Sequence, residues 1–583
     1  MKGSAGILMR KHEIKELLSV ASGEKRAELV IKGVNVVNVC SSEIYEADIA
    51  VHKGIIVGVD RGYEGIREED EREKFAVPGL IDAHTHLEMS MLSASEFARV
   101  VVPRGTTAVV ADPHEIANVL GVEGVRAMIE DASRTPLKLF FTAPPCVPST
   151  RTGLETGGAS ISVADVEEML RDERCVGIAE VMDVNAVISG EEEIFAKILA
   201  AKHAKKAVDG HAPMLSGKLL NAYVLGGACS DHECVSADEA LEKIRKGMHV
   251  MVREGTAARN LRAIAPLLRS QCTERFMLVT DGDRATGDLW ENGCADFLVR
   301  RAIEEGIDPV KAVQMCTINP AMFFNLKNIG SITPGKIADI VIVESMERFE
   351  VRRVFVNGVE IKEEDFPEHP FNYPKYGKSV NAIPVSAEKL VLAEEKACRL
   401  TGERRKARII QLVENEIITE EKKAEISGVN VEKDILKVAV IERHNRTGNV
   451  GIGFVRGFGL KSGAIASSVS HDSHNIVVVG TNEGDMALAC NRLTDIGGGI
   501  VMCDRGSVIC EIPLPIAGLM SDERVERVIE RCNRVDEEMR VRGCGMNALY
   551  ALSFIALPVI PSLRITDKGL VDVRKGEIVP VFC

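Results

Sequence analysis

The spacing of apolar and polar side chains near the start of the chain is typical of a short helix followed by strands. Residues 11–22 carry apolar side chains at helical spacing. Residues 27–39 and 46–60 alternate between apolar and polar side chains, which predicts antiparallel strands joined by polar turns. A similar pair of strands recurs at 336–345 and 351–361. We therefore expect one small β-sandwich that is assembled from both sets of strands.

Between these two sets, predicted strands alternate with predicted helices. This alternation is typical of a (β/α)8 barrel of about 250 residues, and an open doubly wound sheet would show the same alternation. The presence of eight strands and of the flanking sandwich favours the TIM-like barrel. The predicted barrel strands are 79–86, 106–114, 137–145, 176–183, 207–213, 228–234, 249–255 and 276–283.

The last third of the chain has a different pattern. Strand-like runs at 434–442 and 475–480 are interleaved with predicted helices at 484–497 and 523–535, which indicates an α+β domain. The predicted domains are a composite β-sandwich (24–77 plus 331–365), a metal-dependent catalytic barrel (78–330) and a C-terminal α+β domain (380–583).

Composition and charge exclude several classes of protein. With 72 Lys and Arg against 86 Asp and Glu, the net charge is −14, which argues against a nucleic-acid partner. The longest apolar stretch, around 548–561, is shorter than a membrane-spanning helix. The first residues become charged too soon for a secretory signal. Fifteen cysteines without a CxxC pair are typical of reduced thiols, so we expect a cytoplasmic protein.

Potential metal ligands gather at the carboxyl ends of five predicted barrel strands. These ends converge on one face of a barrel, where active sites lie. In a histidine–x–histidine strand segment both imidazoles point to the same side. Any one of these histidines could be a hydrogen-bonded core residue, but the set favours a site for one or two divalent metals. The candidate ligands are His84, His86, Glu180, His211, His232 and Asp281.

Several segments resemble known proteins. The first-strand segment PGLIDAHTHLE (78–88) resembles the signature of the amidohydrolase superfamily, whose members are metal-dependent hydrolases with a barrel and a flanking β-sandwich. Further matching segments are VADPHEIANVLG (110–121), GIAEVMD (177–183), GHAPML (210–215), SDHEC (230–234), REGTAARNL (253–261), TDGD (280–283) and SSVSHDSHN (467–475). Together they resemble the microbial adenine deaminase family over nearly the whole chain.

The resemblance implies hydrolytic deamination of free adenine to hypoxanthine and ammonia, a reaction of purine salvage. It also implies two divalent metals per chain, with manganese or iron favoured over zinc, and a homodimer or larger homo-oligomer. Many superfamily members bridge two metals with a modified lysine after strand 4, whereas this chain has Glu180 there. We expect Glu180 to bridge the metals, although a structural salt bridge is the alternative.

The remaining assignments follow from the chemistry of deamination. We expect His84, His86 and Asp281 to bind one ion, and His211 and His232 to bind the other. A carboxylate must take the proton of the attacking water and return it to the leaving amine. Asp281, at the end of strand 8, is the predicted shuttle.

Other polar residues are candidate substrate contacts. His114 and Glu115 could face the purine and take part in catalysis, or they could belong to a helix cap. Arg253 and Glu254 end strand 7 and could contact the ring edges. In the C-terminal domain, the residues His471, Asp472 and His474 could form a lid over the barrel, a further metal site or a structural turn.

Other functions remain possible for this fold. Amidohydrolases also cleave cyclic amides and deacetylate amino sugars, and a scaffold can lose its chemistry while it keeps the fold. The lysine-free strand 4 argues against cyclic amide hydrolysis, and the C-terminal domain argues against both reactions. Every position where a metal ligand is expected carries a histidine or a carboxylate, which argues against a non-catalytic scaffold. The chain also lacks the CxxC ligand pair of zinc deaminases that act on nucleic acid.

Overall fold

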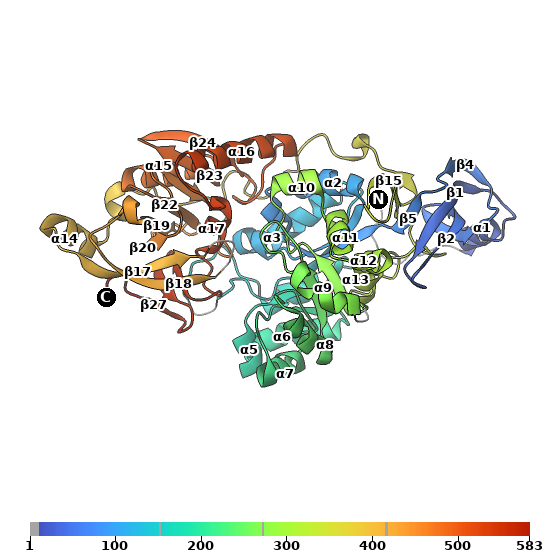
Figure 1. Ribbon diagram of the computed structural model, residues 1–583, viewed down its shortest axis with the longest axis horizontal. Helices are drawn as coiled ribbons and strands as arrows, with labels where there is room; N and C mark the ends of the chain where they lie inside the picture. Colours follow the sequence, from blue (N-terminus) through green and yellow to red (C-terminus); the bar gives the residue numbers. More distant parts are fainter. Residues whose placement is uncertain (1–10, 151–152, 271–272, 414–417) are drawn as a thin grey trace.

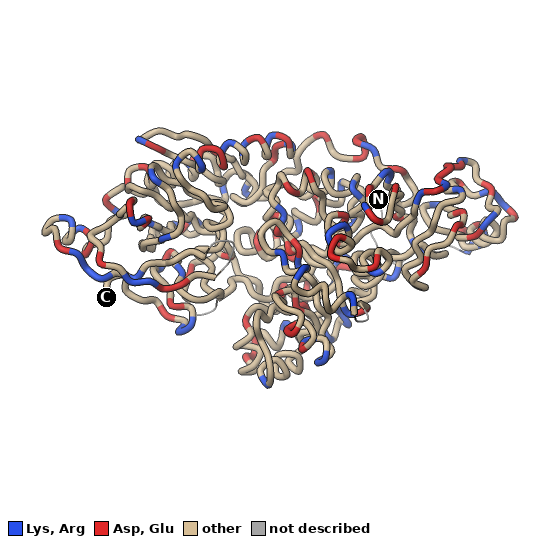
Figure 2. The backbone as a smooth tube through the Cα atoms, viewed as in Figure 1, with Lys and Arg blue, Asp and Glu red and all other residues tan. Residues whose placement is uncertain are grey.

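The computed structural model describes residues 11–583 except 151–152, 271–272 and 414–417. The molecule is elongated, with a β-rich domain at one end, a barrel in the centre and the C-terminal domain at the other end (Figure 1). Acidic and basic residues are interspersed along its length (Figure 2). Among the helices described, none is both long enough and apolar enough to cross a membrane.

The flanking sheet is built from both sides of the barrel, as predicted. Strand β5 pairs antiparallel with β14, and Val77 lies opposite Val341, so the entry to the barrel and the exit from it are hydrogen-bonded to each other. Helix α1 (Lys11–Ala21) packs near the hairpin β2–β3. The strands of this single eight-stranded sheet are β1 (Ala27–Asn38), β2 (Glu43–His52), β3 (Ile55–Asp60), β4 (Gly65–Asp70), β5 (Phe75–Pro78), β14 (Ile340–Val343), β15 (Val351–Val356) and β16 (Val359–Glu360).

The barrel contains the eight predicted strands, which are parallel and form a five-stranded and a three-stranded sheet. The two sheets meet at both seams: the Cys229 amide donates to the Val208 carbonyl, and the Asp281 amide donates to the His84 carbonyl, each at 3.0 Å. The predicted (β/α)8 fold is therefore confirmed. The barrel strands are β6 (Leu80–Thr85), β7 (Thr106–Ala111), β8 (Lys138–Ala143), β9 (Cys175–Val181), β10 (Ala207–Gly210), β11 (Ser230–Asp231), β12 (His249–Arg253) and β13 (Phe276–Val279).

Helices surround these strands, so that the strands are buried on both faces. Every residue of β6, β7 and β9 is buried, including polar residues such as Asp82, His84 and Glu180. The helices are α2 (Ala94–Val101), α3 (His114–Ala132), α4 (Val163–Met169), α5 (Val184–Ser189), α6 (Glu192–His203), α7 (Gly217–Gly226), α8 (Ala237–Arg245), α9 (Leu261–Ser270), α10 (Thr286–Asn292), α11 (Ala295–Glu304), α12 (Pro309–Met315) and α13 (Ile318–Phe323).

The C-terminal domain has the predicted α+β composition. Its eight-stranded sheet has the order β18-β17-β20-β19-β22-β21-β23-β24, and a smaller sheet contains β25 to β27. Its elements are α14 (Ala393–Thr401), β17 (Arg405–Leu412), β18 (Thr419–Ile426), β19 (Ile435–Ile441), β20 (Val450–Arg456), β21 (Ala464–Ser467), β22 (Ile476–Gly480), α15 (Glu483–Asp495), β23 (Gly499–Asp504), β24 (Ser507–Pro513), α16 (Val525–Val541), α17 (Ala548–Phe554), β25 (Leu563–Thr566), β26 (Gly569–Asp572) and β27 (Glu577–Val579). Helix α16 is longer than predicted.

Hydrogen bonds join the C-terminal domain to the barrel. Glu96 of α2 accepts the Val525 amide at 2.7 Å, so a barrel carboxylate occupies the positive end of α16. Asp567 accepts the amide of Thr156 at 2.9 Å and its hydroxyl at 2.7 Å. The two domains therefore meet in a fixed orientation beside the barrel mouth.

A buried lysine stabilises the C-terminal domain. Lys437 on β19 lies 2.6 Å from Glu395 and 2.5 Å from Glu483, and its side chain has no exposure. We expect Lys437→Met to lower the free energy of unfolding by about 3 kcal/mol, because Glu395 loses its buried cation and keeps only the partly exposed Arg399. Lys422→Met, which removes an exposed pair with Glu420, should cost less than about 1 kcal/mol. Equal unfolding midpoints of the two variants in circular dichroism would contradict this expectation.

Candidate active site at the barrel mouth

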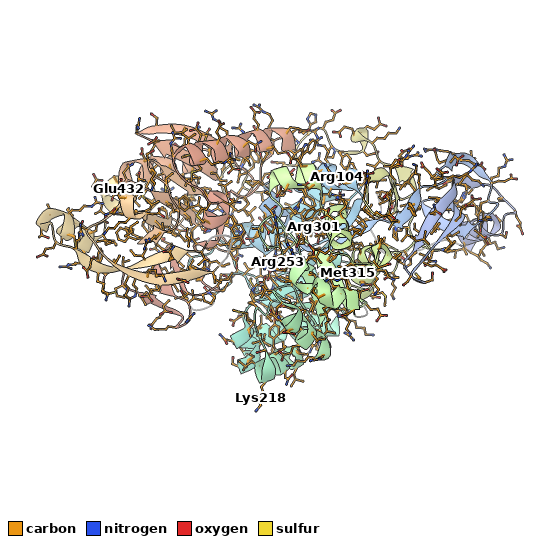
Figure 3. The ribbon with its side chains drawn as sticks, viewed as in Figure 1. Arg104, Lys218, Arg253, Arg301, Met315 and Glu432 are labelled. Atoms are coloured by element: carbon orange, nitrogen blue, oxygen red, sulfur yellow. The ribbon has the colours of Figure 1, made fainter. Side chains whose placement is uncertain are left out.

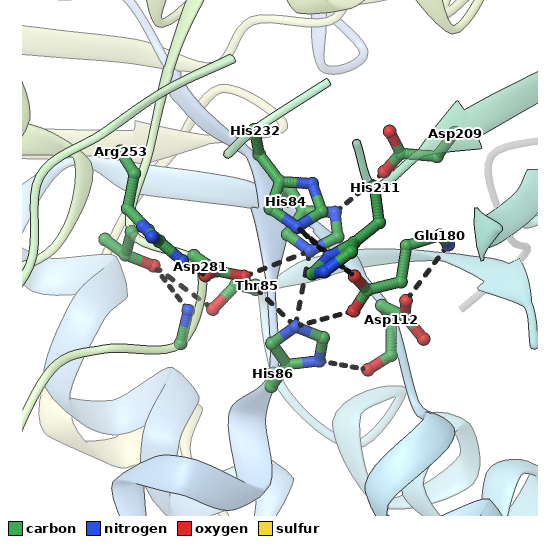
Figure 4. Close-up of polar contacts among 12 residues, drawn as sticks. His84, Thr85, His86, Asp112, Glu180, Asp209, His211, His232, Arg253 and Asp281 are labelled. Atoms are coloured by element: carbon green, nitrogen blue, oxygen red, sulfur yellow. Dashed lines mark hydrogen bonds and ion pairs between the residues drawn. The ribbon is translucent and has the colours of Figure 1, made fainter. Parts of the chain in front are cut away.

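The first group of candidate ligands comes from both ends of the barrel sequence. Nε2 of His84 and Nε2 of His86 lie 3.3 Å apart, and Oδ1 of Asp281 lies 3.2 Å from each (Figure 4). Nδ1 of His84 donates to Asp209 at 2.8 Å, and Nδ1 of His86 donates to the Asp112 carbonyl at 3.0 Å. When the rings are neutral, both Nε2 atoms present lone pairs to each other and to a carboxylate. A bound cation would satisfy this arrangement.

The second group lies beside the first. Nδ1 of His211 is 2.6 Å and Nε2 of His232 is 3.2 Å from Oε2 of Glu180, and the two nitrogens are 3.3 Å apart. The other carboxylate oxygen of Glu180 is 3.6 Å from Nε2 of His86. Glu180 thus lies between the two groups, in the position that a bridging ligand would occupy.

The electrostatics of the two carboxylates suit metal ligands. Burial alone would raise the pKa of Asp281, but His232, His84 and His86 hold it well below its usual range. Burial likewise opposes ionisation of Glu180, and His211 and His232 lower its pKa well below the ordinary value. Both side chains are therefore anionic, and the imidazole and carboxylate donor set fits divalent transition metals.

Arg253 connects two acidic residues of the site. Its guanidinium donates to Glu233 at 2.8 Å and to Oδ2 of Asp281 at 2.7 Å, and it lies where the barrel meets the C-terminal domain (Figure 3). Arg253 lines the cavity, and it also fixes the orientation of Asp281. Sequence reasoning missed Glu233, although it directly follows His232 in the SDHEC segment.

The structure corrects the prediction for Glu254. This side chain does not line the cavity, and its carboxylate instead binds Arg301 at 3.2 Å and the Leu261 amide at 3.2 Å. The physical reason is the geometry of an extended strand, in which neighbouring side chains point to opposite sides. Because Arg253 points into the mouth, Glu254 points toward the surrounding helices.

His114 and Glu115, in the first turn of α3, line the cavity. Nδ1 of His114 lies 3.5 Å from Glu180, and its Nε2 lies 3.3 Å from Glu115. Asp112 accepts the His114 amide at 3.1 Å, so it binds a free N–H of the first turn as the predicted cap would, although Pro113 directly precedes the helix. The DPHE segment therefore lines the cavity and also binds the start of α3.

The C-terminal domain reaches Glu115 with two histidines. Nδ1 of His471 lies 2.5 Å from one carboxylate oxygen, and Nε2 of His474 contacts the other. Burial raises the pKa of Glu115, but His471, His114 and His474 outweigh it and hold the pKa well below its usual range. The carboxylate is therefore ionised and is held by groups from both domains.

The geometry argues against a further metal at this contact, although the three groups are close enough to hold one. Nδ1 of His474 accepts the Ser470 amide at 3.2 Å, so the ring proton is on Nε2, which donates to Glu115. Burial lowers the pKa of His474 to about 4, which keeps the ring neutral. A protonated nitrogen cannot coordinate a metal, so the contact is a hydrogen-bonded cluster over the barrel mouth.

The cavity has one polar side and one apolar side. The barrel provides the histidines and carboxylates, and the C-terminal domain provides Asp472 and an apolar wall. Helix α17 lies on the face of that domain that is turned toward the barrel (Figure 1). The wall consists of Tyr550, Phe554, Leu557, Val559 and Ile560.

Comparison with known proteins agrees with this architecture. The Amidohydrolase family profile matches residues 75–361, and the Adenine deaminase C-terminal domain profile matches 411–577. The adenine deaminase of Archaeoglobus fulgidus is 50% identical over 97% of this chain and 98% of its own length. Those of Methanothrix thermoacetophila and Desulfatibacillum aliphaticivorans are 44% and 42% identical over 98% and 97% of this chain, and each is covered over 99% of its length. Because both profiles and the full-length relatives agree, the chain belongs to the adenine deaminase family within the amidohydrolases.

Proposed function

We propose that the barrel mouth binds two divalent cations per chain and deaminates free adenine to hypoxanthine and ammonia. The observation that carries the proposal is the convergence of two imidazole nitrogens and a carboxylate oxygen, in side chains whose other polar atoms are already hydrogen-bonded. The proposed ligands of one ion are His84, His86 and Asp281, those of the other are His211 and His232, and Glu180 lies between them.

The donor set bears on the identity of the metals. Imidazole and carboxylate donors accept manganese, iron and zinc, and they disfavour metals that require thiolate. Among these we propose manganese or iron as the working metals, with zinc as a compatible substitute. When bound, divalent ions lower the pKa of coordinated water toward about 7 and so supply a nucleophile at neutral pH.

The chain's own residues perform the proton transfers. In the proposed mechanism Asp281 takes a proton from the attacking water and delivers it to the exocyclic nitrogen, because an amide ion is a very poor leaving group. Its Oδ2 is bound by Arg253, which keeps the carboxylate in one orientation. Glu115 and His114 lie on the neighbouring side of the cavity, within reach of the purine ring. The apolar wall excludes bulk water from this exchange.

Metal removal tests the proposal. Protein stripped with a chelator should release no ammonia from adenine, and titration with Mn²⁺ should restore activity in proportion to bound metal up to two ions per chain. Adenosine, guanine, cytosine and a cyclic amide should be poor substrates in parallel assays. If the fully metal-loaded protein did not turn over adenine, the proposed substrate would be wrong. If the metal-free protein were active, the proposed role of the metals would be wrong.

A further inference from the structure

Two residues of the C-terminal domain that line the cavity each have a buried polar atom without a protein partner. Nε2 of His471 and Oδ2 of Asp472 have no hydrogen bond to any residue that the structure describes. Both residues are only 3% exposed. Buried polar atoms are almost always paired, because an unpaired one loses its hydration without compensation. Because both residues line the cavity, a molecule bound there is placed to complete their hydrogen bonds.

These two residues belong to one fixed unit with the apolar wall. The His471 amide donates to the Ser553 carbonyl at 2.8 Å, and the His471 ring lies 4.8 Å from that of Phe554. Buried Arg564 donates to the Phe554 carbonyl at 2.8 Å and to the Ile560 carbonyl at 2.8 Å, which ties down the end of α17 and the loop after it. The unpaired atoms and the wall thus keep a set position relative to each other.

The chemistry of the two atoms defines what they can bind. Nδ1 of His471 lies 2.5 Å from Glu115, so the tautomer that donates to this carboxylate from Nδ1 presents Nε2 as an acceptor. A carboxylate oxygen such as Oδ2 of Asp472 is also an acceptor. The molecule that completes both must offer hydrogen-bond donors. Free adenine offers its exocyclic amine and one ring N–H, whereas a purine substituted at N9 has lost that ring N–H.

We propose that Asp472 accepts the ring N–H of the free base, with His471 as the second acceptor, and that this pair selects adenine over its N9-substituted derivatives. The inference rests on the proposed deamination of adenine and adds the residues that determine its specificity. The proximity of Asp472 to the barrel ligands supports it: Oδ1 lies 3.8 Å from Nε2 of His114, whose Nδ1 is 3.5 Å from Glu180.

The decisive experiment uses the Asp472→Asn variant and the wild-type enzyme, each loaded with Mn²⁺. Each is assayed with adenine and with 9-methyladenine. Loss of a charged acceptor should raise KM and the equilibrium Kd for adenine by roughly 10- to 100-fold, with a smaller change in kcat. The preference for adenine over 9-methyladenine should shrink by a similar factor. An unchanged KM with a lower kcat would overturn the proposal, because it would assign Asp472 to the chemical step.

A matched control separates recognition from domain docking. Asp567 also belongs to the C-terminal domain and binds a barrel residue, Thr156, but it does not line the cavity. We expect Asp567→Asn to leave the preference for adenine unchanged. An equal loss of preference in both variants would overturn the proposal in favour of a purely structural effect.

One measurement needs no variant. As a competitive inhibitor of the wild-type enzyme, 9-methyladenine should bind at least about 100-fold more weakly than adenine, because a site built for an N–H rejects an analogue that lacks it. Equal binding would overturn the proposal even if Asp472→Asn failed to fold. Wild-type protein with two metals and no turnover of adenine would instead refute the proposed function, so the two failures are distinguishable.

Discussion

Replacing Glu180 by glutamine is expected to reduce bound metal below two ions per chain and to lower kcat for adenine by roughly 10³-fold or more. The two carboxylate oxygens face different groups of ligands: Oε2 lies 2.6 Å from His211, and Oε1 lies 3.6 Å from His86. Glutamine keeps the shape but carries no charge, and its NH2 group would face one of the two metals. Metal analysis and ammonia release measure the two effects separately.

Glu254→Gln is the matched control for Glu180→Gln. It makes the same change at another strand end, but Glu254 binds Arg301 outside the cavity. We expect this variant to keep both metals and the wild-type kcat. If Glu180→Gln retained two metals and full activity, the bridging assignment would be wrong. A loss of activity confined to Glu254→Gln would instead show that Glu254 contacts the substrate.

Asp281→Asn is expected to lower kcat by about 10²–10⁴-fold, the range of general acid–base catalysis. An amide cannot take the proton of the attacking water and return it to the amine. Asparagine keeps an oxygen that can accept from Arg253, so the protein should still fold and bind at least one ion. The measurement is kcat at fixed metal content. Retention of most of the rate would place the shuttle elsewhere, with Glu115 as the next candidate.

The strand ends are the part of this site that sequence predicts best. The sequence pattern indicates where β6, β9 and β13 end. In a closed barrel of parallel strands, these carboxyl ends must lie on the same face. The sequence alone is therefore enough to group His84, Glu180 and Asp281 in one site. Positions one residue apart are harder to assign, because Arg253 and Glu254 differ only in the side of the strand that each occupies.

Contacts between domains could not be predicted in the same way. Nothing in the local pattern around Glu115 indicates that its partner is His474, which lies 359 residues further along the chain. That pairing depends on how two separately folded surfaces dock, and local periodicity carries no information about docking. Asp209 was missed for a related reason: its carboxylate supports His84 of β6 from β10, at the other edge of the five-stranded sheet and 125 residues away in sequence. The cluster at residues 471–474 was recognised as polar, but its partners were not.

The distance in sequence between Glu115 and His474 has a consequence for how the protein is made. At about 5–20 residues per second, a ribosome needs on the order of 20–70 s to travel the 359 residues between them. The proposed metal ligands, of which Asp281 is the last, all emerge before the C-terminal domain that covers them. A nascent chain therefore presents an open barrel mouth to cellular cations, and synthesis of the remaining residues closes it over whatever ions it has acquired.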